Sequence, residues 1–95
     1  MIDLEEKYIN FIKEGFSKYL KNYKLYLFGS RAKGTAREYS DIDLAVDCLD
    51  FTDEKKDKLN LYFMDSLLPY KIDIIDLNSV KEPFKSLITP DLILL

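Results

Sequence analysis

Residues 24–47, KLYLFGSRAKGTAREYSDIDLAVD, constrain the fold of this chain more than any other stretch. An apolar run from Leu25 to Phe28 ends at Gly29-Ser30. After a polar segment, Asp41 to Leu44 open a second apolar run. This pattern predicts a strand, a tight glycine turn into a short helix, and a second strand. The turn would lie close to two carboxylates, an arrangement suited to a nucleoside triphosphate and its metal ions.

The glycine turn has the residue types of a phosphate-binding loop. Gly29 lacks a Cβ, so the chain can turn sharply there and a ligand can approach the backbone closely. Ser30 is expected at a helix N-terminus, where free amides and the helix dipole favour phosphate oxygens. Arg31, Lys33 and Arg37 supply positive charge nearby. We therefore predict that Gly29, Ser30, Arg31 and Lys33 bind the phosphates of a nucleotide.

Two aspartates at the start of the second strand supply oxygen ligands. Side chains two residues apart in a strand share a face, so Asp41 and Asp43 point the same way, with Cα atoms about 6.5 Å apart. Both carboxylates can then converge on one Mg²⁺ or on two ions about 3.5–4 Å apart. A turn with surface aspartates would not explain their alternation with Ile42 and Leu44. Asp47 shares their face but lies further along the strand, and we expect it at the surface.

A third carboxylate is expected in a later strand. Asp73 stands between Ile72 and Ile74, and a carboxylate buried there is costly unless it meets a metal or a hydrogen-bond donor. Asp73 is therefore the preferred candidate. Asp76 is the alternative, although it faces the opposite side of the sheet and could instead cap the final helix. A phosphate-binding turn beside these carboxylates predicts metal-assisted nucleotidyl transfer.

An amphipathic helix is predicted over residues 3–21, because apolar residues recur three and four positions apart and Asp3 can serve as its N-cap. Gly15 interrupts this helix at a cost of about 1 kcal/mol relative to Ala. The tyrosines and phenylalanines of the helix are expected to pack in the core rather than to stack on bases. Asn22 is expected to end the helix, and the first strand follows from Tyr23.

A second helix is predicted over residues 53–68, after a strand from Asp41 to Cys48. Thr52 is its expected N-cap, and Pro69 is expected to stop it. The residues expected on its core face are Leu59, Phe63, Ser66 and Leu67.

Three further elements are predicted in the last third of the chain. Residues 70–77 form a strand whose nearly continuous apolar character indicates burial on both faces. Residues 79–82 resemble a capping box that opens a last helix to about residue 88, with a start that Pro83 can shift by a few residues. The apolar tail, residues 92–95, is expected to pair as an edge strand, with direct contact to a partner as the alternative.

The composition is that of an ordinary globular domain. Of the 95 residues, 47% are hydrophobic and 33% are charged, which is enough to bury a modest core. The predicted fold class is α/β (α+β), with a small mixed β-sheet of three to four strands flanked by helices in a single domain, residues 1–95.

No apolar run approaches the ~20 residues that span a bilayer, and no signal peptide is visible, so we expect no membrane contact and a cytoplasmic location.

The charge and the missing residue types exclude several functions. A net charge of −3 argues against direct nucleic-acid binding, since such domains usually carry a strong basic excess. The chain contains no histidine, which excludes Ser-His-Asp hydrolysis and HExxH metalloproteases. Its one cysteine, Cys48, excludes an internal disulfide and any multi-cysteine zinc site.

The combined motif resembles a known family. Gly29-Ser30, Gly34 and Ser40 to Leu44 are similar to the signature of the DNA polymerase β-like nucleotidyltransferase superfamily. The sequence GSRAKGTA followed by SDIDLA most closely resembles its minimal nucleotidyltransferases (MNT). The resemblance implies a polymerase β-like core and attack of a hydroxyl on the α-phosphorus of ATP. It also implies two Mg²⁺ ions, one held by Asp41, Asp43 and Asp73 and one by Asp41 and Asp43.

The resemblance also implies a partner that carries the acceptor hydroxyl. MNT proteins typically act as antitoxins that AMPylate a tyrosine of a HEPN-domain toxin, so a hetero-oligomer with such a toxin is expected. Transfer to a small-molecule hydroxyl is one alternative. The other is a non-catalytic antitoxin that binds and masks its toxin.

Overall fold

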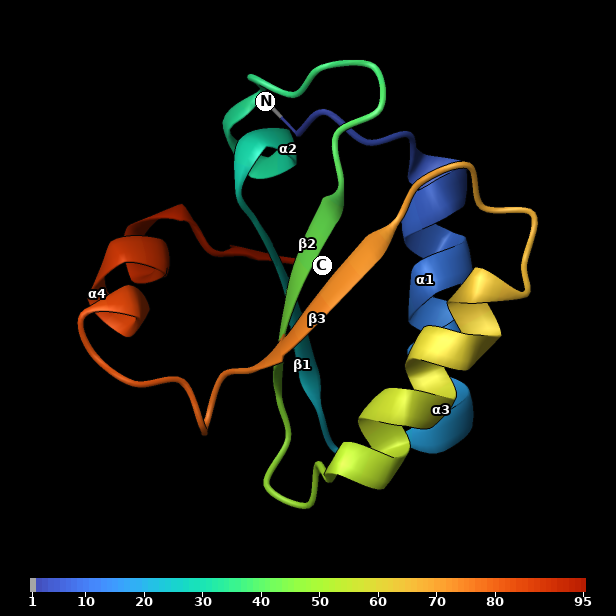
Figure 1. The fold of residues 1–95 in the computed structure, drawn as a ribbon, viewed down its shortest axis with the longest axis vertical. Coiled ribbons are helices and arrows are strands. Elements are labelled where there is room, and N and C mark those ends of the chain that lie inside the picture. The colour runs from blue at the N-terminus through green and yellow to red at the C-terminus, as the bar shows by residue number, and fades with distance from the viewer. Residues whose placement is uncertain (1) are drawn as a thin grey trace.

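The structure is a computed structural model that describes residues 2–95. The chain forms a four-stranded sheet in the order β3-β2-β1-β4, with helices on both of its faces (Figure 1). This arrangement confirms the predicted α+β fold class with a small mixed sheet. Among residues 2–95, no helix is both long and apolar enough to cross a membrane. The elements in chain order are α1 Glu6–Tyr19, β1 Lys24–Phe28, α2 Ser30–Lys33, β2 Ile42–Asp47, α3 Asp53–Met64, β3 Ile72–Asp76, α4 Phe84–Ile88, the 3-10 helix η1 Thr89–Asp91, and β4 Ile93–Leu94.

Strand β2 lies between β1 and β3 and fixes the register of both. It pairs antiparallel with β1, where Phe28 is opposite Asp43, and parallel with β3, where Asp43 is beside Asp73. Strand β4 pairs antiparallel with the other edge of β1, with Ile93 opposite Leu27. The prediction that the apolar tail completes the sheet is therefore confirmed.

The two faces of the sheet carry different side chains, because residues alternate across each strand. One face packs on α1 and α3, which lie together on one side of the sheet in Figure 1. On the other face, Phe28 and Ala45 form a smaller cluster with Ile88 of α4. Asp43 and Asp73 alternate with the core residues and so belong to this second face. The strand residues buried toward α1 and α3 are Leu25, Leu27, Ile42, Leu44, Val46 and Ile74.

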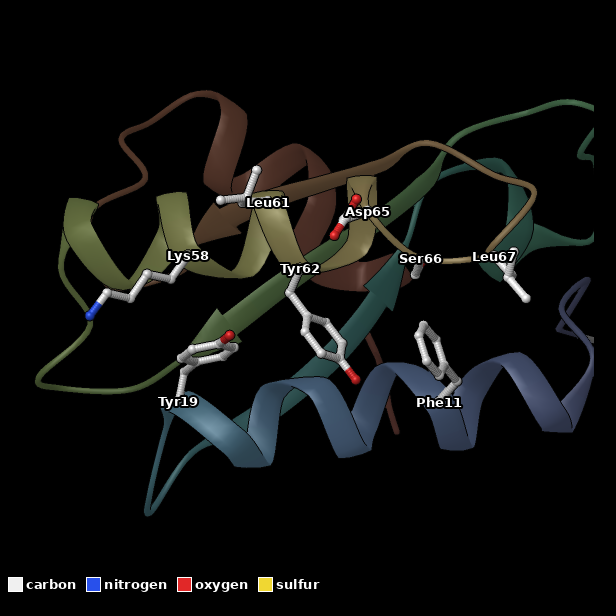
Figure 2. A pocket seen from close by; sticks show the side chains of 8 residues that line it. All are labelled: Phe11, Tyr19, Lys58, Leu61, Tyr62, Asp65, Ser66 and Leu67. Atoms are coloured by element: carbon white, nitrogen blue, oxygen red, sulfur yellow. The ribbon is translucent and has the colours of Figure 1, made fainter.

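Aromatic side chains fill the contact between α1 and α3. Tyr62 points from α3 toward α1, where its ring stacks on Phe11 with centroids 5.9 Å apart (Figure 2). Phe63 packs on Phe16 with centroids 5.8 Å apart. Phe11, Phe16 and Tyr19 of the first helix therefore lie in or against the core, as predicted. Gly15, between them on α1, is also buried and allows the two helices to approach closely.

Both ends of the first helix differ from the prediction. Glu5 is the N-cap residue, and Asp3 instead donates its backbone N–H to the carbonyl oxygen of Arg31 at 2.7 Å. The prediction that Asp3 caps the helix is therefore wrong. At the other end the helix stops at Tyr19 with Leu20 as its C-cap, before Asn22, which adopts a positive φ of 51°.

The second long helix begins as predicted and ends earlier. The Thr52 hydroxyl accepts a hydrogen bond from the Lys55 backbone N–H at 3.2 Å, which confirms the N-cap. The helix ends at Met64, because the Ser66 hydroxyl then donates to the Phe63 carbonyl at 2.6 Å and turns the chain before Pro69.

The predicted core face of this helix is half right. Leu59 and Phe63 are buried, with relative exposures of 0% and 5%. Leu67 is fully exposed and Ser66 lies beyond the helix, because the helical period stops at Met64. Neither residue therefore lies on the core face.

Strand β3 was predicted to be buried on both faces, and this is wrong. It forms one edge of the sheet, and of its five residues Ile72–Asp76 only Ile74 is buried. The predicted capping box after it is also wrong, because the Ser79 hydroxyl donates to the Asp76 carboxylate at 2.8 Å. The last helix begins only at Phe84, after Pro83.

We predict that Gly15→Ala destabilises the protein. A methyl group at this position would lie 2.8 Å from ring carbons of both Phe63 and Tyr62, so one ring or one helix must move. Overpacking of this kind costs about 1–3 kcal/mol, and the better helix propensity of Ala returns about 1 kcal/mol. We expect a net loss of about 1 kcal/mol in the free energy of unfolding, measured with urea. Asn10→Ala, at an exposed position of the same helix, is the control and should not lower stability; equal stability of the two variants would contradict the packing argument.

Candidate functional site

The glycine turn has the predicted local structure. Gly29 leaves β1 with φ 76° and ψ −157°, and Ser30 is the first residue of α2. Gly34 ends this one-turn helix in the left-handed conformation and donates its N–H to the Ser30 carbonyl. These positive φ values favour glycine, so the sequence marks both ends of α2.

The space in front of Gly29 is taken by Asp43. A methyl group at position 29 would overlap Oδ2 of the Asp43 carboxylate. The cause is the pairing of β1 with β2, which sets Asp43 opposite Phe28, the residue just before the turn. The glycine therefore allows a carboxylate, as well as any ligand, to lie against the backbone of the turn.

Two other carboxylates act on Asp43 at this end of β2. Asp43 is half-buried, whereas Asp41 and Asp73 are exposed. Burial raises the pKa of the Asp43 carboxyl above its ordinary value, and repulsion from Asp73 and then Asp41 raises it further. The structure thus sets Asp73 beside Asp43 and places Asp41 near enough to act on the Asp43 charge.

The chemistry of these side chains fits a hard cation. They offer oxygen donors, which Mg²⁺ prefers, and a bound cation would relieve the repulsion that raises the pKa of Asp43. As the side chains stand, no group of three or more His, Cys, Asp or Glu among residues 2–95 is arranged to hold a metal ion. The fit therefore rests on the donor type and on the shared strand register.

Asp73 lies beside Asp43 for a different structural reason from the one predicted. The sequence argument assumed a buried carboxylate, but Asp73 is exposed because β3 is an edge strand. Its place beside Asp43 comes from the parallel pairing of β2 and β3. Burial of an acid was thus the wrong physical reason for selecting this residue.

Asp76 has a structural role at the end of β3. Its carboxylate accepts hydrogen bonds from the Asn78 backbone N–H at 3.0 Å and from the Ser79 hydroxyl at 2.8 Å. These bonds close the turn that follows the strand. Asp47 accepts from the Asn78 side-chain amide at 3.0 Å and lies at the same far end of the sheet.

The predicted phosphate-binding cations are engaged elsewhere. Arg31 is 4% exposed, and its guanidinium donates to the backbone carbonyls of Asp3, Glu38 and Ser40. Lys33 forms an ion pair with Asp91, with Nζ and Oδ2 3.3 Å apart. Sequence reasoning missed the carbonyl partners of Arg31, because the motif gives no signal for backbone groups that approach it from other segments.

Comparisons with known proteins bear on the family of this chain. The model of the family "Polymerase beta, Nucleotidyltransferase" matches residues 10–95. A curated relative is the probable protein adenylyltransferase MntA of Haemophilus influenzae, which is 33% identical over 90 residues, or 92% of this chain and 77% of the relative.

Two similar solved structures are toxin–antitoxin crystal structures. One, determined with AMP-PNP, has a TM-score of 0.65 and 31% identity and matches 76% of this chain and 59% of its own. The other is a mutant of the toxin–antitoxin MntA–HpeT, with a TM-score of 0.63 and 26% identity, and matches 76% of this chain and 58% of its own. The present chain therefore spans less than two thirds of these solved chains.

The raised pKa of Asp43 predicts that Asp43→Asn stabilises the metal-free protein. An acid with a raised folded-state pKa destabilises the fold above that pKa, and the penalty disappears as the pH falls through the unfolded value, ordinarily 3.8. In EDTA at pH 7 we expect a gain of less than about 1 kcal/mol in the free energy of unfolding, since solvent screens a half-buried carboxylate. The gain should shrink toward about pH 3, where wild-type Asp43 is protonated.

Urea unfolding at both pH values measures this difference. Asp47→Asn is the matched control on the same strand, and it should give no gain because Asp47 accepts a hydrogen bond from Asn78. A loss of stability in Asp43→Asn at pH 7 would show that the repulsion among the three carboxylates is not significant.

Proposed function

Since the chain belongs to the polymerase beta nucleotidyltransferase family, we propose that it is a protein adenylyltransferase and an antitoxin. In this proposal it transfers AMP from ATP to a tyrosine hydroxyl of a HEPN-type toxin. The observation that carries the proposal is the strand register that sets Asp43 beside Asp73 and against the Gly29 turn. A phosphate-binding turn and a carboxylate cluster therefore meet at one point of the sheet.

The relatives support the nucleotide and the kind of partner. The H. influenzae relative is named as a probable protein adenylyltransferase, and one solved toxin–antitoxin contains AMP-PNP. An ATP analogue in a similar structure supports ATP as the donor here. The toxin–antitoxin relatives support a toxin as the acceptor, and the MNT-like motif in the sequence supports a HEPN toxin with a tyrosine target.

Each site residue has a role in this proposal. Gly29 and the backbone at Ser30 bind the terminal phosphates of ATP. Asp41, Asp43 and Asp73 would hold two Mg²⁺ ions, which when bound lower the pKa of the attacking hydroxyl and offset the charge of the triphosphate. The hydroxyl oxygen forms a bond to the α-phosphorus, the bond from that phosphorus to the bridging oxygen breaks, and pyrophosphate leaves.

Asp73 is placed for the acceptor side of the reaction. It is exposed at the sheet edge, so an incoming hydroxyl can reach it from solvent, and its carboxylate can take the hydroxyl proton. Lys33 is exposed beside the turn, and in this proposal its ammonium leaves the ion pair with Asp91 to balance charge that develops on the phosphates. Arg31 does not have this freedom, because its donors are bound to carbonyls.

We predict that Asp43→Asn abolishes AMP transfer. The purified protein, ATP, Mg²⁺ and a cognate HEPN toxin are mixed, and the toxin mass is followed by mass spectrometry. Wild-type protein should add one or more AMP units to a toxin tyrosine, with the RNase activity of the toxin falling in step. Asp76→Asn is the control and should transfer normally, because Asp76 only closes the turn after β3. Equal modification by Asp43→Asn would refute the site. A stable complex without modification would identify a masking antitoxin instead.

Asp73→Asn should separate chemistry from binding. If Asp73 serves the acceptor hydroxyl, its loss should lower the transfer rate by about 10²–10⁴-fold, the usual contribution of a positioned base. Binding of AMP-PNP with Mg²⁺ should be largely retained, because Asp41 and Asp43 remain. Calorimetric titration with AMP-PNP and single-turnover transfer measure the two quantities. If Asp73→Asn loses AMP-PNP binding but transfers AMP from bound ATP at the wild-type rate, Asp73 serves nucleotide binding and not the acceptor hydroxyl.

A further inference from the structure

Arg31 is the only charged side chain buried among residues 2–95, and it is not balanced by a carboxylate. Its Nε donates to the Ser40 carbonyl at 3.0 Å, and its Nη1 and Nη2 donate to the carbonyls of Asp3 at 2.8 Å and Glu38 at 3.3 Å. Its Cζ lies 4.1 Å from the centroid of the Tyr70 ring. The buried charge is therefore compensated by carbonyl dipoles and an aromatic face.

These contacts reach the segments that lead into both carboxylate-bearing strands. Ser40 directly precedes Asp41, and Tyr70 stands three residues before Asp73. The same two segments are joined by the Ile42 N–H, which donates to the carbonyl of residue 71 at 2.9 Å. One guanidinium thus connects the entry to β2 with the entry to β3.

The guanidinium also anchors the chain that leads into the first helix. Asp3 both accepts from the Arg31 side chain and donates its N–H to the Arg31 carbonyl at 2.7 Å. Tyr8 of α1 then packs edge-on against the Tyr70 ring, with centroids 5.5 Å apart. Arg31 is therefore fixed from three directions and has little freedom to swing toward a ligand.

The geometry of Arg31 matters here more than its charge. A guanidinium is a rigid planar fork that can bind three carbonyls and stack on a ring at once. A lysine ammonium has neither the fork nor the flat face, although it keeps the charge.

We propose that Arg31 is a positioning residue for the transfer reaction: its fork fixes the distance from Asp41 and Asp43, at the start of β2, to Asp73 on β3. The catalytic consequence rests on the proposed function, whereas the effect on the geometry of the carboxylates does not. Arg31 itself touches neither phosphate nor acceptor in this assignment. It acts through the backbone of Ser40 and the ring of Tyr70.

The test compares Arg31→Lys with wild type and with Glu38→Gln, an exposed side chain in the same loop. Affinity for Mn²⁺ alone, without ATP or toxin, is measured by electron paramagnetic resonance. We expect Arg31→Lys to lose about tenfold in Mn²⁺ affinity, the lower end for groups that orient metal ligands. In the transfer assay kcat should fall by about a hundredfold, as for a misplacement near 1 Å. KM for ATP should change by less than about threefold, because the phosphate-binding turn is kept.

Exchange of the Ile42 amide hydrogen gives a readout that needs no metal, ATP or toxin. It should accelerate in Arg31→Lys and stay unchanged in Glu38→Gln, because the bond from Ile42 to residue 71 joins the two strand entries. If exchange accelerates in Arg31→Lys but the wild-type protein transfers no AMP, the proposed function is refuted and the positioning role is kept. The positioning role alone would be overturned by a different outcome. In that outcome wild-type protein transfers AMP normally, and Arg31→Lys matches Glu38→Gln in Mn²⁺ affinity, kcat and amide exchange.

A second pair of variants covers the case in which Arg31→Lys does not fold. Tyr70→Leu removes the ring under the guanidinium and leaves all three carbonyl acceptors, whereas Tyr70→Phe keeps the ring. Tyr70→Leu should weaken Mn²⁺ binding and speed Ile42 exchange, and Tyr70→Phe should do neither. Equal values for the two Tyr70 variants would overturn the proposal.

Discussion

The pairing of β2 with a strand on each side is the constraint on which the rest of this structure depends. Antiparallel pairing with β1 sets Asp43 opposite Phe28 and so against Gly29, while parallel pairing with β3 sets it beside Asp73. A slip of one residue in either register would move these carboxylates to the other face of the sheet. The register is held because Ile42, Leu44 and Val46 are completely buried against α1 and α3.

The same register has an electrostatic cost. It brings a half-buried carboxylate close to two others, and burial, followed by repulsion from Asp73 and Asp41, raises the pKa of Asp43. Hydrophobic packing on the opposite face offsets this cost, because Ile42, Leu44 and Val46 of β2 contribute to the main core. A cluster of repelling acids is expected where a cation is to be bound, and its cost is consistent with a site shaped for a ligand rather than for stability.

Local features of the fold were predictable from the sequence, and features set by distant contacts were not. The glycine turn, the two-residue alternation in β2 and the Thr52 cap all depend on neighbouring residues, so they can be recognised in order along the chain. The apolar run in β3 indicated a strand but gave no sign that it lies at the sheet edge. From the sequence, Gly15 only lowers the helix propensity of its segment. Its favourable role, which is to leave room for aromatic rings of α3, depends on a distant contact.

The exposure of the three carboxylates decides from which side an acceptor can reach the site. Helix α4 covers part of the second face of the sheet, where Ile88 packs on Phe28 and Ala45. Asp43 is turned toward the Gly29 backbone, whereas Asp73 stands exposed on the edge strand. In the proposed function, a bulky acceptor from a partner therefore meets Asp73 first, and the nucleotide phosphates lie on the side of the turn. Asp73 is exposed because β3 is an edge strand. The same edge position makes the burial argument wrong and, in the proposed function, lets an acceptor reach this carboxylate.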